Sequence, residues 1–127
     1  MLRFRVSIGV FLATALAGCG GSSSPAPSAP TPSPPAAVTV TIPTGASSLG
    51  SAAFVPNPVT VSVGTTVTWS NTDTASATGH NMVADNGAFS SDIFSNGGRY
   101  SFTFQSRGTF PYHCSRHPSM VGTVVVQ

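Results

Sequence analysis

The sequence predicts an all-β domain, an antiparallel sandwich, and three observations support that fold class. Apolar residues alternate with polar ones over short runs, with the period of two that places one face of a strand against a core. Gly, Pro, Asn and Asp separate these runs. Only 6% of the 127 residues are charged, none is Lys or Glu, and no segment keeps a helical period. Such a composition favours strands and loops over helices.

The predicted strands follow one another from residue 38 onward. In the run 59–63, for example, Val59, Val61 and Val63 share one parity, and Gly64 then marks a turn. Each run of this kind presents one apolar face, which two packed sheets would bury together. The predicted strands cover residues 38–42, 59–63, 67–69, 100–104, 110–114 and 124–126.

The N-terminus has the pattern of an export signal. Arg3 and Arg5 precede an apolar run over residues 6–17, and small residues follow. A membrane-spanning helix is the alternative, but it needs roughly 20 apolar residues. We therefore expect a signal peptide over residues 1–18. The end of this segment, Leu16-Ala17-Gly18-Cys19, resembles the bacterial lipobox, which implies that Cys19 is lipidated and becomes the first mature residue.

Residues 19–37 are expected to be the lipid-anchor Cys and a linker, followed by the folded domain over residues 38–127. Six of the eighteen residues from 20 to 37 are Pro, with Ser and Ala between them. Such a stretch favours an extended polyproline II conformation of about 3.1 Å per residue. We expect an exported domain held off a membrane on its periplasmic or extracellular side. The lipobox resemblance, with Gly20 after the Cys, implies the outer membrane in a Gram-negative cell.

The balance of charges and the lack of catalytic motifs in the sequence argue against several classes of function. Without the signal, three Arg balance three Asp, so the mature chain is neutral and has no basic patch for nucleic acid. The three Asp are scattered, there is no paired-carboxylate motif, and no Gly-rich phosphate-binding motif is present. A Cys–His nucleophile lacks an orienting third residue. We do not expect an enzyme.

A candidate metal site lies near the C-terminus. Cys114, His117 and Met120 fall within seven residues, and His80 supplies a second imidazole. One thiolate, two imidazoles and a weak thioether are the ligands of a blue-copper electron-transfer site. The alternatives are a buried core thiol, an ordinary His, apolar packing of the Met, or zinc, although structural zinc prefers four strong donors. A single remaining Cys in an exported chain cannot form an internal disulfide.

Several segments resemble the small cupredoxins. Residues 54–71 look like their second and third strands, residues 89–104 like the middle of their fold, and residues 112–120 like the ligand loop of the plastocyanin/amicyanin group. The Cys-x-x-His-x-x-Met spacing is nearer to amicyanin than to plastocyanin. The resemblance implies a Greek-key β-sandwich and one type 1 copper ion held by the four residues above. It also implies that Asn81 ties the two ligand loops together by hydrogen bonds near Ser115.

His113 is left without a role in that site. Strand alternation points it away from the face that carries Cys114. In copper nitrite reductases a His adjacent to the type 1 Cys binds a second, catalytic copper, but this chain contains only three His. We therefore expect His113 to be packed or exposed to solvent.

The resemblance implies a carrier of single electrons that meets its redox protein partners transiently, and we expect a monomer. Electrons would pass through the exposed edge of His117, with Pro118 and Met82 as candidates for a surrounding apolar rim and Arg116 as a nearby charge. The alternative is a copper carrier, scavenger or assembly factor that uses the same ligands. A purely structural surface domain is a third possibility, in which Cys114 has no metal to bind.

Overall fold

The computed structural model describes residues 36–127. The predicted signal peptide, Cys19 and nearly all of the linker lie outside that range and stay predictions. Among the described residues, no helix is both long enough and apolar enough to cross a membrane. The strands of this part of the chain are β1 (Ala37–Ile42), β2 (Val59–Val61), β3 (Thr66–Asn71), β4 (Val83–Ala84), β5 (Arg99–Thr103), β6 (Gly108–Cys114) and β7 (His117–Val126).

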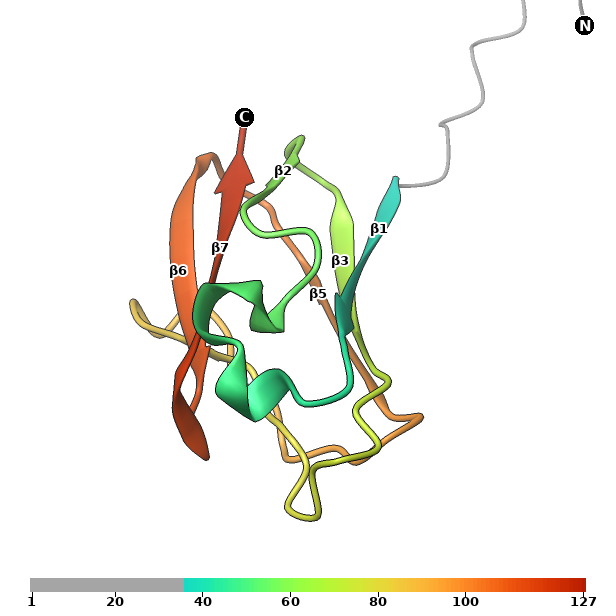
Figure 1. Cartoon of the computed structure of the whole chain (residues 1–127). Coiled ribbons are helices and arrows are strands. Elements are labelled where there is room, and N and C mark those ends of the chain that lie inside the picture. The colour runs from blue at the N-terminus through green and yellow to red at the C-terminus, as the bar shows by residue number, and fades with distance from the viewer. Residues whose placement is uncertain (1–35) are drawn as a thin grey trace, which may run out of the picture. The chain divides into compact units, whose positions relative to one another are not determined.

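These strands form two facing sheets, so the prediction of an all-β sandwich is confirmed (Figure 1). One sheet has the order β1-β3-β5 and the other the order β2-β7-β6-β4. From β1 to β6 the chain alternates between the sheets, in keeping with Greek-key connections. The sandwich is not antiparallel throughout, because β1 pairs with β3, and β2 with β7, in parallel. A strand that returns to a sheet after a visit to the other one can enter it in the same direction as before.

Two regions depart from the simple strand pattern. Between β1 and β2 the chain forms two short 3-10 helices, η1 (Ala46–Ser48) and η2 (Gly50–Ala53). His80 lies outside the named strands and forms an isolated bridge to Phe94, and only the short β4 follows it. Neither region shows alternation in the sequence. Their backbone groups form hydrogen bonds within turns and in single β-bridges rather than along a pair of long strands.

The core holds the alternating apolar side chains together with a cluster of aromatic rings. Trp69 of β3 and Tyr112 of β6 come from opposite sheets, are almost completely buried, and meet edge to face with ring centroids 5.4 Å apart. Such pairs stabilise by about 0.5–1.5 kcal/mol beyond the area they bury. The Tyr112 ring also lies against Gly122 of β7, where any Cβ would overlap with it. This packing locks β6 and β7, the two strands that flank the candidate metal site, to the rest of the core.

Candidate metal centre

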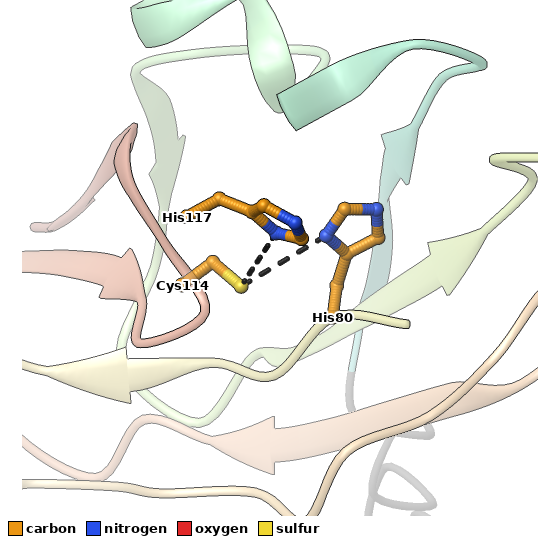
Figure 2. Close-up of side chains that lie close together, drawn as sticks. All are labelled: His80, Cys114 and His117. Carbon is orange, nitrogen blue, oxygen red and sulfur yellow. Dashed lines mark hydrogen bonds between the residues drawn. The ribbon is translucent and has the colours of Figure 1, made fainter. Parts of the chain in front are cut away.

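Three of the predicted ligands converge at one end of the sandwich. The Sγ of Cys114 lies 3.8 Å from Nδ1 of His80 and 3.6 Å from Nδ1 of His117 (Figure 2). The ligand atoms of all three residues lie within 4.8 Å of one another. His80 and Cys114 are completely buried, and His117 is partly exposed.

A tight turn between β6 and β7 places two of these residues. Cys114 ends β6, His117 begins β7, and the two are paired across the turn, with an irregularity in register between His113 and Cys114. Only Ser115 and Arg116 separate the strands, so backbone pairing holds both ligands. The other end of this hairpin pairs Gly108 with Val126, next to the C-terminus in Figure 1.

Met120 lies further along β7. Its side chain is completely buried, and the buried Val124 and Val126 share its parity and face the core. Cys114 is buried on the inner face of the neighbouring strand β6. Met120 therefore faces inward from the same sheet as the thiol, on the strand that also carries His117.

His80 reaches the site from a separate segment, which the backbone holds by a reciprocal pair of bonds. The N–H of His80 donates to the carbonyl of Phe94 at 3.1 Å, and the N–H of Phe94 donates to that of His80 at 2.8 Å. Gly79 precedes His80 with φ of +69°, and a Cβ there would lie 2.9 Å from the Phe94 carbonyl oxygen. Glycine is therefore the residue that lets the chain approach Phe94 and turn His80 inward.

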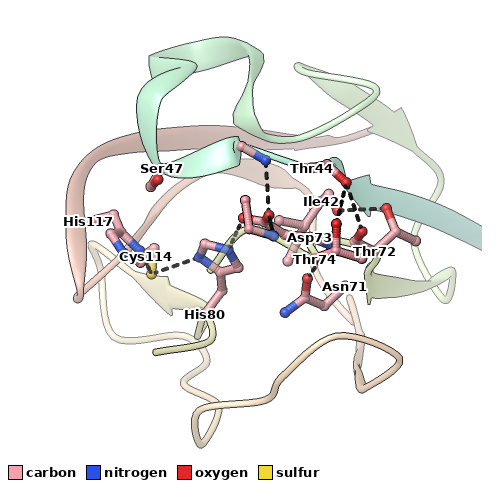
Figure 3. A network of polar contacts seen from close by, with 12 residues as sticks. Ile42, Thr44, Ser47, Asn71, Thr72, Asp73, Thr74, His80, Cys114 and His117 are labelled. Carbon is pink, nitrogen blue, oxygen red and sulfur yellow. Dashed lines mark hydrogen bonds and ion pairs between the residues drawn. The ribbon is translucent and has the colours of Figure 1, made fainter. Parts of the chain in front are cut away.

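The outer nitrogen of His80 is bound by a buried carboxylate. Nε2 of His80 lies 2.9 Å from Oδ2 of Asp73, and both side chains have 0% exposure (Figure 3). Oδ1 of Asp73 accepts the backbone N–H groups of Gly45 at 2.9 Å and Ala75 at 2.8 Å. Burial alone would raise the pKa of Asp73, but its hydrogen bonds and the charge of His80 outweigh burial and lower this pKa to about 2. Asp73 was not among the predicted site residues.

Asn81 joins the two ligand segments. Its Oδ1 accepts the backbone N–H and the hydroxyl of Ser115, each at 3.0 Å, and lies 3.6 Å from Sγ of Cys114. The structure thus brings together Asn81 and Ser115, the two residues that were expected to link the loops. Bonds of this kind orient metal ligands and restrain their movement.

His117 is the ligand nearest to solvent. Burial is the largest cause that lowers the pKa of His117 below its ordinary value; Arg116 and a protonated His80 would act in the same direction, and Asp73 acts in the opposite direction. This favours the neutral imidazole, the form that binds metals. Pro118 is exposed beside it, but Met82 is completely buried, so the expectation that Met82 belongs to an exposed rim is wrong. Met82 has the parity of His80 and points into the core with it.

His113 points away from the metal site. Its Nδ1 lies 2.6 Å from Oδ1 of Asp85, with 36% of the His113 side chain and 51% of the Asp85 side chain exposed. Among residues 36–127, His113 belongs to no group of three or more His, Cys or acidic side chains that could hold a metal ion.

The donor set fits a type 1 copper ion. Metal–sulfur bonds of about 2.3 Å and metal–nitrogen bonds of about 2.0–2.1 Å, the values for zinc, place two donors of one ion within about 4.4 Å. The distances from Cys114 to both imidazoles satisfy this limit. A thiolate, two imidazoles and a thioether suit copper, whereas a thioether is not a ligand of structural zinc.

Comparison with known proteins supports the same conclusion. Residues 40–127 match the copper-binding proteins of the plastocyanin/azurin family. Amicyanin from Paracoccus denitrificans is 40% identical over 72 residues, which are 53% of this chain and 53% of amicyanin, so the match spans about half of that relative. A novel purple cupredoxin from Nitrosopumilus maritimus superposes with a TM-score of 0.63 and 34% identity over 71% of this chain and 99% of its own. The copper-containing nitrite reductase of Thermus scotoductus superposes with a TM-score of 0.60 and 29% identity over 74% of this chain but 23% of its own.

Proposed function

The chain belongs to the plastocyanin/azurin family of copper-binding proteins, and on that premise we propose that it carries single electrons between redox protein partners. The observation that carries the proposal is the convergence of Cys114, His80 and His117 on one point from two separate segments of a β-sandwich. Bound copper would supply a one-electron couple, Cu(II)/Cu(I). Every other requirement of electron transfer falls on the protein.

The first requirement is a site that changes little when the electron moves. Backbone pairing holds Cys114 and His117, the bridge to Phe94 holds His80, and Asn81 ties the two segments together. Side chains held in this way keep one arrangement for both oxidation states, so little reorganisation opposes transfer.

The second requirement is an exit for the electron. His80 and Cys114 are completely buried, whereas His117 is partly exposed, beside the exposed Pro118 and Arg116. A partner can therefore approach the site most closely at the edge of His117. With no net charge on the mature chain, such encounters are expected to be brief, as in the small interfaces of redox pairs.

A catalytic role has less support. The nitrite reductase resembles this chain over only 23% of its own length. A second copper site built on His113 would need further imidazoles, and the other two His of the sequence lie at the first site. In the structure His113 is paired with Asp85 instead.

For the location we propose that the domain is anchored by a lipid on Cys19, on the periplasmic or extracellular side of a membrane. The export signal, the lipobox resemblance and the Pro-rich linker of residues 1–37 support this. Metabolic labelling with a radioactive fatty acid tests it: the wild-type chain is expected to be labelled and Cys19→Ser is not. A labelled Cys19→Ser protein would contradict the anchor.

Electrochemistry separates an electron carrier from a copper carrier, the alternative function. We expect a reversible Cu(II)/Cu(I) couple, fast electron self-exchange, and slow copper loss to a chelator in both oxidation states. Rapid loss of copper together with sluggish self-exchange would favour the copper carrier.

Met120 provides a test of the axial position. Met120→Gln is expected to keep the copper and to lower the reduction potential, because the weak axial ligand tunes that potential. Val124→Ala, on the same face of β7 but further from the ligand turn, is the control. If Met120→Gln left the potential at the wild-type value, Met120 would not be a ligand.

A further inference from the structure

A buried charge touches the ligand set without belonging to it. Asp73 lies in the segment after β3, and its carboxylate is completely removed from solvent. Isolated buried carboxylates are costly, so a retained one is compensated by specific partners. Asp73 has three partners, the backbone N–H groups of Gly45 and Ala75 and the Nε2 of His80.

These partners determine which nitrogen of His80 carries the proton. A carboxylate only accepts hydrogen bonds, so Nε2 of His80 must be the donor. A neutral imidazole then has its lone pair on Nδ1, the atom that lies 3.8 Å from Sγ of Cys114. The contact with Asp73 therefore selects the one neutral tautomer that presents a metal-binding nitrogen to the site.

The carboxylate also contributes charge. The Asp73 carboxylate and the Cys114 thiolate together carry two negative charges. A divalent ion would make the site neutral, whereas a monovalent ion would leave it with one net negative charge. No Lys or Arg side chain forms a salt bridge with Asp73 in residues 36–127, so nothing but His80 and the backbone dipoles offsets this charge. In a buried environment such a difference is only weakly screened.

We propose that Asp73 is a positioning residue of the copper site, which holds His80 in the Nε2–H tautomer and makes the site favour oxidised over reduced copper. This inference rests on the proposed function for its second part, since the oxidation states matter only if copper is bound. The first part concerns the metal-free protein alone.

Asp73→Asn tests both parts, because the backbone donors leave the amide little choice of orientation. Its oxygen would face the N–H groups of Gly45 and Ala75, so its NH₂ group would face His80. Nε2 of His80 must then accept, and the proton moves to Nδ1. In the metal-free proteins, ¹⁵N NMR of the imidazoles is expected to show the Nε2–H tautomer in wild type and the Nδ1–H tautomer in Asp73→Asn.

In the copper-loaded proteins the expected effect is a changed ratio of affinities. Loss of a partner to a ligating His typically weakens metal binding about 10–100-fold. We expect Asp73→Asn to lower the affinity for Cu(II) at least about tenfold more than the affinity for Cu(I). A tenfold fall in the ratio of Cu(II) to Cu(I) affinity raises the one-electron reduction potential by about 59 mV. A residue that only supported the fold would lower the melting temperature without moving the tautomer or this ratio.

Asp85→Asn is the matched control, because it makes the same change in the exposed pair with His113. In Asp85→Asn, the tautomer of His80 and the copper reduction potential are expected to equal those of the wild type. Three outcomes would overturn the inference. The first is an Nδ1–H tautomer of His80 in the wild type. The others are a reduction potential that Asp73→Asn does not raise, or one that Asp85→Asn raises equally. If Asp73→Asn does not fold, the tautomer of the wild-type protein still decides the first part of the inference. A wild type with no reversible copper couple would instead refute the proposed function and leave the tautomer test intact.

Discussion

Two Asp–His pairs of the same chemistry lie in different surroundings. In one, Asp73 and His80 are both completely buried at 2.9 Å; in the other, Asp85 and His113 meet at 2.6 Å with a third to a half of each side chain exposed. The shorter contact belongs to the exposed pair, so distance does not rank the two. Water and salt screen the exposed pair, whereas the buried pair acts at nearly full strength on the metal ligand it contains.

Burial is therefore what distinguishes the two pairs. The Asp73–His80 pair acts on a metal ligand, whereas the Asp85–His113 pair lies at the surface and contacts no ligand. Each pair also has a neighbouring glycine with positive φ and a neighbouring Asn, which allows matched substitutions in the two regions.

The largest difference is expected when each His is removed. His80→Ala deletes a strong ligand and should weaken Cu(II) binding by at least about 100-fold or abolish the visible thiolate-to-copper band. His113→Ala should leave both unchanged, since its side chain points away from the site. Copper titrations followed by visible absorption measure the difference. Equal losses in the two variants would contradict the assignment of His80.

The next effect concerns the glycines. Gly79→Ala forces a positive φ on a residue with a side chain and brings its Cβ to 2.9 Å from the Phe94 carbonyl. Gly87→Ala has the same backbone cost, about 1–2 kcal/mol, but meets nothing within 4 Å. We expect Gly79→Ala to lower the free energy of unfolding by at least about 1 kcal/mol more than Gly87→Ala, as measured by denaturant titration of the metal-free proteins. The opposite order would mean that the segment before His80 is free to relax.

A smaller effect is expected for the Asn residues. Asn81→Ala leaves the backbone N–H and the hydroxyl of Ser115 without their acceptor and should cost about 1–3 kcal/mol of unfolding free energy. Asn86→Ala removes only an exposed bond to the N–H of Ala88 and should cost about 0.5 kcal/mol or less. Thermal and denaturant unfolding of the metal-free proteins compare the two. A cost for Asn81→Ala no greater than that for Asn86→Ala would show that Asn81 does not tie the loops.

The smallest effect is expected at the exposed pair itself. Asp85→Asn should change the unfolding free energy by at most about 0.5 kcal/mol, and salt should reduce even that difference, because exposed ion pairs contribute little. Unfolding at low and at high ionic strength measures it. A loss of several kcal/mol would mean that exposure does not distinguish the two pairs.

The sequence predicts the regular part of this molecule well, for a physical reason. Alternation records which face of a strand is buried, so the strands around Val40, Val61, Trp69 and Tyr112 are found from the pattern alone. The spacing from Cys114 to His117 is equally local, since it reflects one tight turn between two paired strands.

The pattern does not reveal contacts that irregular segments make. Asp73 and His80 are seven residues apart in a stretch without periodicity, and nothing in the sequence indicates that the chain folds back to join them. One signal was available: a buried His ligand needs an acceptor for its second nitrogen, and the chain has only three carboxylates to provide it. Met82 was misplaced for a related reason, because residues 79–82 are all buried and no alternation in the sequence distinguishes an inner face of this segment from an outer one.

The central claim is that Cys114, His80 and His117 share one copper ion, and a Cu(II) titration of the purified metal-free protein tests it most directly. We predict saturation at one equivalent with an intense visible thiolate-to-copper band, and no such band in Cys114→Ser. A wild-type protein that stays colourless with Cu(II), or a band of equal intensity in Cys114→Ser, would contradict it.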